Sequence, residues 1–174
     1  MSEKLYHFVR DIPDFPKPGI LFRDITPLLL DPGAMAAAIQ ALAEPLSKLR
    51  ITKVAAIESR GFLLGAPVAM ALGVGLALIR KPGKLPAGTH RVDYDLEYGT
   101  DALESHRDAL GPSDRVAVVD DVLATGGTAC AAGALVERSG ARVAGYAFLI
   151  ELTALGGRPR LTGQVSSVLT YPRP

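Results

Sequence analysis

The sequence predicts an α/β fold in which helices flank a central, mostly parallel sheet. Apolar runs at 54–57, 76–79 and 116–119 are too short for helices and suit strands that are buried on both faces. Segments with helical character separate these runs, and strands that alternate with helices indicate parallel pairing. A chain of 174 residues can bury one sizeable core, so we expect a single domain over residues 1–174.

The first thirty residues do not look like part of that core. The first nine could form a short helix, but three prolines between 13 and 18 then force an extended path with turns. The stretch 20–25 mixes apolar and charged side chains. On local sequence alone, Phe22 belongs to a surface flap that covers the core.

Two helices are expected before the third apolar strand. Asp31 and Pro32 are a good helix start, because a capping side chain precedes a proline at the first helical position. Pro45 should interrupt and kink this helix. The stretch 61–79 has no charged residue and is long enough to span a membrane, but two glycines divide it into a helix-like and a strand-like part. We therefore expect a buried βαβ unit and no membrane span.

Composition narrows the possible functions. Lys plus Arg (19) nearly balance Asp plus Glu (18), so the broad basic field that nonspecific nucleic-acid binding uses is absent. The single cysteine, Cys130, excludes an internal disulfide and fits a reducing cytoplasm. The three histidines are scattered and lack metal-ligand spacing. We expect a cytoplasmic protein that binds neither nucleic acid nor a membrane.

The most informative stretch is 116–128, where a strand, a polar loop and a helix start follow one another. Asp120 and Asp121 stand where the strand should end, which is where open α/β sheets bind ligands. Adjacent carboxylates can bind a sugar diol or approach a cation. The small residues that follow are Ala124, Thr125, Gly126, Gly127 and Thr128. Their backbone N–H groups and the start of the next helix suit a phosphate. The stretch therefore predicts a binding site for a phosphorylated sugar.

An ordinary strand-to-helix turn, with acids that cap the helix, is the bland alternative. The string is neither a P-loop nor a dinucleotide fingerprint, because both signatures are missing. It resembles the phosphoribosyl pyrophosphate (PRPP) motif of type I phosphoribosyltransferases, which implies that family's fold. The resemblance implies that Asp120 and Asp121 bind the ribose hydroxyls and that residues 124–128 bind the 5′-phosphate. It also implies Mg²⁺, held mainly by PRPP and water near the two aspartates.

A second loop follows the strand at 54–57. Glu58 and Arg60 could be a solvated pair, but two strand ends with polar loops should converge on one site. The string from Glu58 to Phe62 resembles the family's pyrophosphate loop. The resemblance implies that Ser59 and Arg60 hold pyrophosphate, with a cis peptide between Glu58 and Ser59.

A third loop, after the strand at 76–79, carries the cations Arg80, Lys81 and Lys84 among turn formers. A charge run is usually solvated, but this one follows a strand end and suits the several negative charges of pyrophosphate. The resemblance implies that these residues contact pyrophosphate, in part across the interface of a homodimer.

The string from Pro13 to Pro27 closely resembles the adenine phosphoribosyltransferase branch of the family. There the segment, about residues 10–30 here, forms a hood over the base. The resemblance implies that Phe22 stacks on adenine while backbone groups near Leu21 and Arg23 read the edge of the base.

Residues 91–110 are a polar excursion between two core strands. The part 91–99 alternates like an exposed strand, and 100–110 carries a short polar helix pattern. Such an excursion suggests a mobile lid. Its pattern Tyr-x-Leu-Glu-Tyr-Gly…Leu-Glu resembles the family's catalytic flexible loop, which implies Tyr98 and Glu104 as the catalytic residues.

Together the resemblances imply purine salvage, in which adenine and PRPP give AMP and pyrophosphate with Mg²⁺. Glu104 would handle protons on the base, and Tyr98 would help to exclude water. Two alternatives remain. One is a phosphoribosyltransferase for another purine base, which only the hood opposes. The other is a non-catalytic PRPP-binding regulator that binds nucleic acid, against which Tyr98, Glu104 and the near-zero net charge argue.

Overall fold

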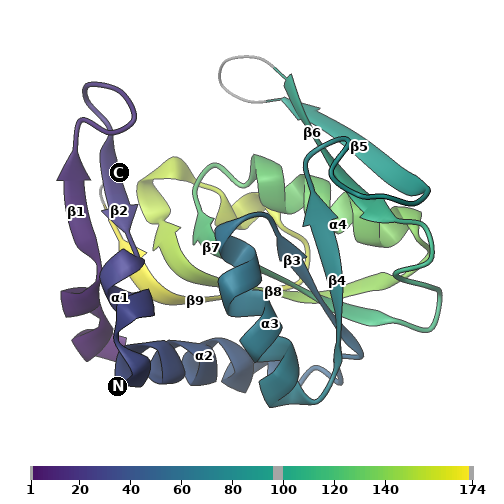
Figure 1. The fold of residues 1–174 in the computed structure, drawn as a ribbon, viewed down its shortest axis with the longest axis horizontal. Coiled ribbons are helices and arrows are strands. Elements are labelled where there is room, and N and C mark those ends of the chain that lie inside the picture. The colour runs from purple at the N-terminus through teal and green to yellow at the C-terminus, as the bar shows by residue number, and fades with distance from the viewer. Residues whose placement is uncertain (1, 96–99, 173–174) are drawn as a thin grey trace.

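The computed structural model describes residues 2–95 and 100–172, in which a seven-stranded sheet carries helices on both faces (Figure 1). The strand order is β5-β6-β4-β3-β7-β8-β9. The parallel strands are β3 (Lys53–Ile57), β4 (Gly75–Arg80), β7 (Arg115–Leu123), β8 (Arg142–Leu152) and β9 (Gln164–Tyr171). An antiparallel hairpin at one edge consists of β5 (Thr89–Asp95) and β6 (Thr100–His106). The predicted fold class is confirmed.

Helices bury an apolar layer on each face of the sheet. One face carries α1 (Thr26–Leu30), α2 (Pro32–Ser47) and α3 (Arg60–Leu72), and the other carries α4 (Gly127–Arg138). Alternation along the strands divides their side chains between the layers. Val54 and Val119 pack with α2 and α3, whereas Ile57 and Val118 pack with α4. Strands that are apolar on both faces are what a parallel sheet requires.

The local sequence predicted the start of α2 correctly, but it did not predict that the helix continues past Pro45. The Asp31 carboxylate accepts a hydrogen bond from the Ala34 N–H at 2.7 Å, as a capping residue should. The predicted interruption at Pro45 is wrong, because the helix continues to Ser47. Leu42 and Leu46 are both 1 % exposed, and their burial outweighs the one helical hydrogen bond that a proline cannot donate.

The apolar stretch 61–79 forms most of α3 and β4, as predicted. Within the described part of the chain, no helix is long and apolar enough to cross a membrane. Shorter helical segments lie at the N-terminus and between β8 and β9. They are the 3-10 helices η1 (Ser2–Phe8), η2 (Thr153–Leu155) and η3 (Arg158–Arg160).

Two antiparallel ribbons rise on opposite sides of the same end of the sheet (Figure 1). One is the predicted hood segment, a separate two-stranded sheet of β1 (Arg10–Pro13) and β2 (Leu21–Asp24). The other is the β5–β6 hairpin. The helix pattern predicted over 100–110 is wrong, because strand β6 occupies most of it. Pairing with β5 and β4 and the full burial of Leu103 override the local pattern.

Candidate functional site

The candidate site lies where β3 and β7 part at their carboxyl ends. From β3 the chain proceeds to β4 on one side, whereas β7 leads to β8 on the other, which makes a topological switch point. β3 pairs with β7 only as far as Val119, and β7 continues to Leu123 beside β8. The sequence predicted that the strand ends before Asp120, but β7 continues past it. Both aspartates therefore lie on β7, along an edge that β3 leaves open.

That open edge forms one wall of a cavity of about 370 Å³. Residues from the end of β3 and the loop after it, from the segment after β4, from β6 and from the loop after β7 complete it. The lining residues are Ile57, Glu58, Ser59, Arg60, Lys81, Leu103, Asp120, Asp121, Val122, Ala124 and Thr128. The two loops that the sequence predicted to converge thus meet in one cavity, and Lys81 from the third loop also lines it.

The two aspartates are close to one another and poorly solvated. The Asp120 carboxylate accepts a hydrogen bond from the Asp121 N–H at 2.9 Å, and the Arg60 guanidinium lies 2.7 Å from the Asp121 carboxylate. Burial raises the pKa of Asp120 well above its ordinary value, and the neighbouring Asp121 carboxylate raises it further. Burial also raises the pKa of Asp121, although Arg60 opposes the shift. Hydroxyl donors or a cation would offset this cost of burial.

The loop 124–128 leads from β7 into α4 and encloses a smaller cavity of about 80 Å³. Gly126 has a φ of 85°, a conformation that glycine adopts without strain. Because the helix starts here, its N–H groups and dipole favour an anion. The five predicted loop residues therefore lie together around a space that suits a phosphate.

The segment after β8 supports this loop from behind. A Cβ on Gly157 would lie 2.3 Å from the Ala124 carbonyl oxygen, so only glycine fits there without movement. The Arg160 guanidinium donates to the Thr125 carbonyl at 2.8 Å. Sequence reasoning assigned neither residue a role, and the glycine pair at 156–157 after a strand was the only local signal.

The predicted pyrophosphate residues are only partly brought together. Ser59, Arg60 and Lys81 line the cavity, and the cis peptide between Glu58 and Ser59 is confirmed. Arg80 reaches the site through an ion pair of 2.6 Å with Glu58. The side chain of Lys84 is exposed and does not line the cavity, although its carbonyl accepts a hydrogen bond from Arg80 at 3.0 Å.

The hood meets the cavity through Phe22. The Arg60 guanidinium lies 4.9 Å from the centre of the Phe22 ring, and Phe15 packs edge-on against that ring with the centres 5.1 Å apart. The side chain of Arg23 points elsewhere, to Asp11 at 2.5 Å and over the Tyr171 ring at 4.1 Å. The contacts of the Phe22 ring and of the backbone at 21–23 with a base stay predictions.

Of the two predicted catalytic residues, the structure describes Glu104, which does not line the cavity. Tyr98 lies outside the described residues. Glu104 stands on β6 opposite Arg80, and its carboxylate accepts a hydrogen bond from the Gly83 N–H at 3.1 Å. From this position it holds the loop 81–84 against the hairpin, and its role in catalysis stays a prediction.

The chain is similar to known proteins over most of its length. A family model described as phosphoribosyl transferase domain matches residues 29–166. A curated adenine phosphoribosyltransferase from Methylococcus capsulatus is 59 % identical, over 97 % of this chain and 99 % of its own length. The chain belongs to the adenine phosphoribosyltransferase family. The sequence resemblance is therefore confirmed, and the chain is an enzyme of the glycosyltransferase class.

Solved adenine phosphoribosyltransferases have the same fold. The crystal structure from Thermoanaerobacter pseudethanolicus is 49 % identical with a TM-score of 0.95, over 98 % of this chain and 100 % of the other. The one from Saccharomyces cerevisiae is 40 % identical with a TM-score of 0.91, over 97 % and 98 % of the two chains. The yeast protein is complexed with adenine and an imino-altritol bisphosphate.

Proposed function

We propose that the chain transfers the phosphoribosyl group of PRPP to adenine in purine salvage, and so forms AMP and pyrophosphate with Mg²⁺. The observation that carries this proposal is the convergence of an acid pair, a phosphate loop and three cations around one cavity. The yeast relative, which holds adenine together with a sugar-like bisphosphate, supports the same pair of ligands. The single cysteine supports a cytoplasmic location.

Each part of the cavity has a task in this reaction. Asp120 and Asp121 bind the ribose hydroxyls, and the loop 124–128 binds the 5′-phosphate, which together fix the position of C1′. The bond from C1′ to pyrophosphate breaks as N9 of adenine bonds to C1′. Positive charge then grows on the sugar and negative charge on the leaving group, which Arg60, Arg80 and Lys81 stabilise.

Mg²⁺ would neutralise part of the charge on pyrophosphate. The described residues include no cluster of three or more His, Cys, Asp or Glu side chains that could hold a metal. Two carboxylates beside a phosphate site suit Mg²⁺, which keeps several waters and binds through one or two carboxylates and substrate phosphates. Asp120 and Asp121 are thus the residues that would approach an ion held mainly by PRPP and water.

The base would bind between Phe22 and the cavity. Phe22 stacks on the ring, and backbone groups near Leu21 and Arg23 pair with the edge that carries the 6-amino group. Glu104 takes up the proton that N9 loses, and Tyr98 helps to exclude water. Glu104 would have to leave the Gly83 N–H in order to reach the base.

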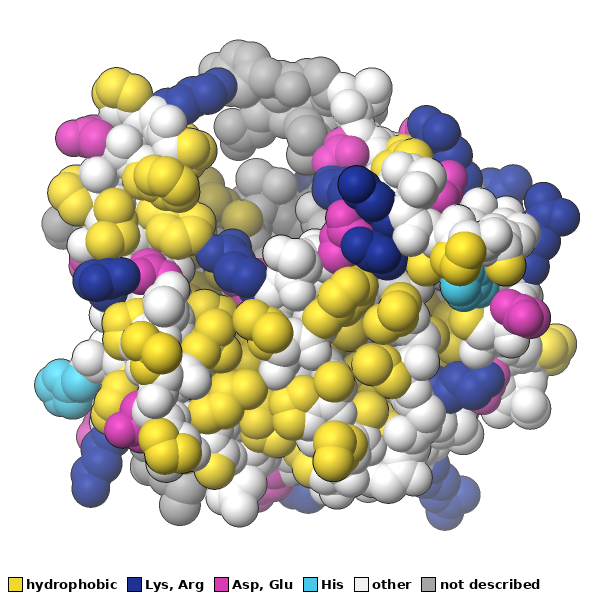
Figure 2. Space-filling view, in the orientation of Figure 1, with side chains coloured by type: hydrophobic (Ala, Val, Ile, Leu, Met, Phe, Trp, Pro, Cys, Tyr) yellow, Lys and Arg dark blue, Asp and Glu magenta, His cyan; other side chains and the backbone are white. Residues whose placement is uncertain are grey.

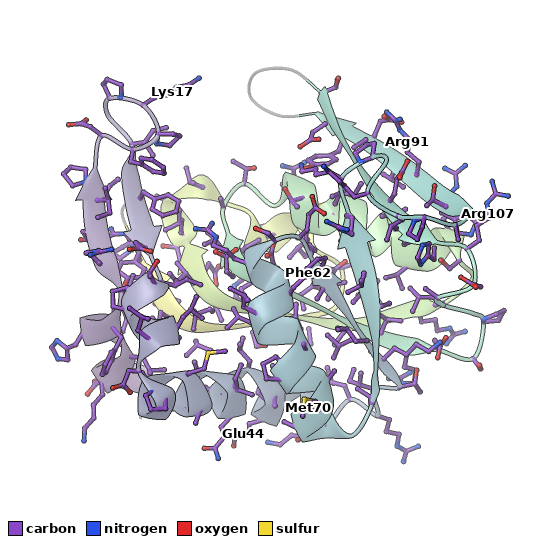
Figure 3. The ribbon with its side chains drawn as sticks, in the orientation of Figure 1. Lys17, Glu44, Phe62, Met70, Arg91 and Arg107 are labelled. Carbon is purple, nitrogen blue, oxygen red and sulfur yellow. The ribbon has the colours of Figure 1, made fainter. Side chains whose placement is uncertain are left out.

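A second copy of the chain is the proposed protein partner. Hydrophobic side chains gather on the face that carries α1, α2 and α3 (Figure 2). Met70 on α3, which is labelled in Figure 3, is 82 % exposed, and Leu30 on α1 is 79 % exposed. An apolar area of this kind marks an interface more often than a free surface.

Sedimentation should show a dimer that Met70→Glu weakens, whereas Glu44→Gln on the exposed side of α2 should leave the dimer intact.

A panel of bases tests the proposed reaction. Adenine, hypoxanthine and guanine are each mixed with the enzyme, PRPP and Mg²⁺, and nucleotide and pyrophosphate are measured. Adenine should react faster by orders of magnitude, because a site that pairs with a 6-amino group leaves its polar groups unpaired against a 6-oxo base. Equal rates for the three bases would contradict the choice of adenine, and no pyrophosphate with any base would contradict the reaction itself.

A further inference from the structure

Lys81 faces the cavity, but its ammonium group already has two partners. It forms an ion pair with the Asp101 carboxylate and lies 3.2 Å from the Tyr94 hydroxyl. The Tyr94 hydroxyl in turn donates to Asp101 at 3.1 Å. Tyr94 and Asp101 face each other across β5 and β6. These contacts therefore fasten the hairpin to the cavity wall.

The same pattern holds for every cation that the proposed reaction uses. The ion pairs are Arg60 with Asp121, Arg80 with Glu58, and Lys81 with Asp101. Each cationic side chain thus has its own carboxylate partner, and a polyanion such as pyrophosphate meets side chains whose charge is already offset. Binding then requires at least one ion pair to open.

Exposure decides which pair opens at the lowest cost. The side chain of Asp121 is 7 % exposed and that of Glu58 is 14 % exposed, so either carboxylate would be left poorly solvated without its cation. The side chain of Asp101 is 28 % exposed, and that of Lys81 is 39 % exposed. Water can replace the partner of Asp101 most easily, because exposed ion pairs are weak.

We propose that Asp101 is a positioning residue that holds Lys81 at the cavity wall and gives it up to the pyrophosphate group, so that carboxylate and pyrophosphate compete for one ammonium. This inference rests on the proposed function. Although burial lowers the pKa of Lys81, the hydrogen bonds with Asp101 and Tyr94 raise it overall, so the ammonium stays charged for the exchange. Since Asp101 lies on β6, occupancy of the pyrophosphate site also releases this contact of the hairpin.

Calorimetry with Mg²⁺-pyrophosphate as the probe tests the competition. Asp101→Asn removes the competing charge and keeps the shape of the side chain, so pyrophosphate should bind about three- to fivefold more tightly than to the wild type. Asp93→Asn is the matched control. Asp93 lies on the same hairpin, is exposed, and forms an ion pair with Arg91. Arg91 is labelled in Figure 3. The change at Asp93 should alter binding by less than about twofold.

The opposite results overturn the inference. If Asp101→Asn binds pyrophosphate no more tightly than Asp93→Asn does, the competition does not exist. A merely structural role for Asp101 would instead weaken binding. Tyr94→Phe gives a second reading, because loss of the hydroxyl loosens the same contact and should tighten binding by a smaller factor.

A variant of the lysine separates this inference from the proposed function. Lys81→Met should weaken pyrophosphate binding, because the ammonium is lost. If the wild type does not bind Mg²⁺-pyrophosphate, or Lys81→Met binds it equally well, the pyrophosphate assignment fails and the inference falls with it. If Lys81→Met weakens binding but Asp101→Asn does not strengthen it, the inference alone fails.

Discussion

The two halves of the cavity are built in different ways. The half proposed for the 5′-phosphate is backbone that the fold holds in place, because the loop 124–128 between β7 and α4 is backed by Gly157. The half proposed for pyrophosphate consists of side chains joined in ion pairs. One half is therefore ready for its ligand, whereas the other must exchange partners.

The largest expected effect comes from the acid pair. Changing both Asp120 and Asp121 to Asn removes the charged acceptors of the ribose hydroxyls, and hydrogen bonds to charged groups are worth about 1.5–3 kcal/mol each. PRPP affinity should fall on the order of a thousandfold, as measured by calorimetry. Asp108→Asn at the exposed end of the hairpin is the control and should have no effect. Unchanged affinity in a folded double variant would make the pair an ordinary feature of the strand.

Substitution of Glu104 tests the half of the cavity proposed for pyrophosphate, where the ion pairs have to exchange partners. If it handles the proton of the base, Glu104→Gln should lower kcat about a hundredfold while PRPP affinity changes little. If the carboxylate only holds the Gly83 N–H, pyrophosphate affinity should fall and kcat should persist. Glu97→Gln is the informative comparison, because Glu97 belongs to the same motif and lies outside the described residues. A larger loss of kcat there would move the role from Glu104 to Glu97.

Gly157 tests whether the phosphate half is held by the backbone behind it. Gly157→Ala places a methyl group 2.3 Å from the Ala124 carbonyl oxygen, so the loop has to shift. We expect PRPP affinity to fall about tenfold, which is within the usual cost of overpacking. Gly111→Ala is the control, because a Cβ there meets no atom within 4 Å. Equal PRPP affinity in the two variants would show that the loop does not depend on this support.

The smallest expected effect is on stability. The pKa of Asp120 is raised in the folded protein, so the native state binds more protons than the unfolded state between the unfolded and the folded pKa values. Stability should therefore fall as the pH rises through that window. Asp120→Asn removes this loss and should unfold at a temperature a few degrees higher than the wild type at pH 7. Thermal unfolding of the wild type and of Asp120→Asn from pH 5 to pH 8 measures this difference in stability. A variant that is less stable than the wild type at pH 7 would contradict the cost of burying the Asp120 carboxylate.

Sequence reasoning was most successful where a signal is local. The apolar runs at 54–57 and 116–119 became strands, and Asp31 became the cap of α2. The same reasoning placed Asp120, Asp121 and the loop 124–128 at the end of the sheet where the cavity lies. Hydrophobic periodicity and small residues after a strand are properties of neighbouring residues, so one sequence is enough to find them.

Sequence reasoning failed where the decisive partner is distant along the chain. Residues 100–106 look helical in isolation, but the edge of β4 and the core around Leu103 make them a strand. The partner of Lys81 depends on β6 lying beside β4, and the support of the phosphate loop depends on the chain returning after β8. The sequence by itself determined the strands, the helix start and the residue types of the cavity. Only the tertiary structure decided which charges pair and which backbone lies behind the loop, because those contacts follow from strand order, which no local pattern encodes.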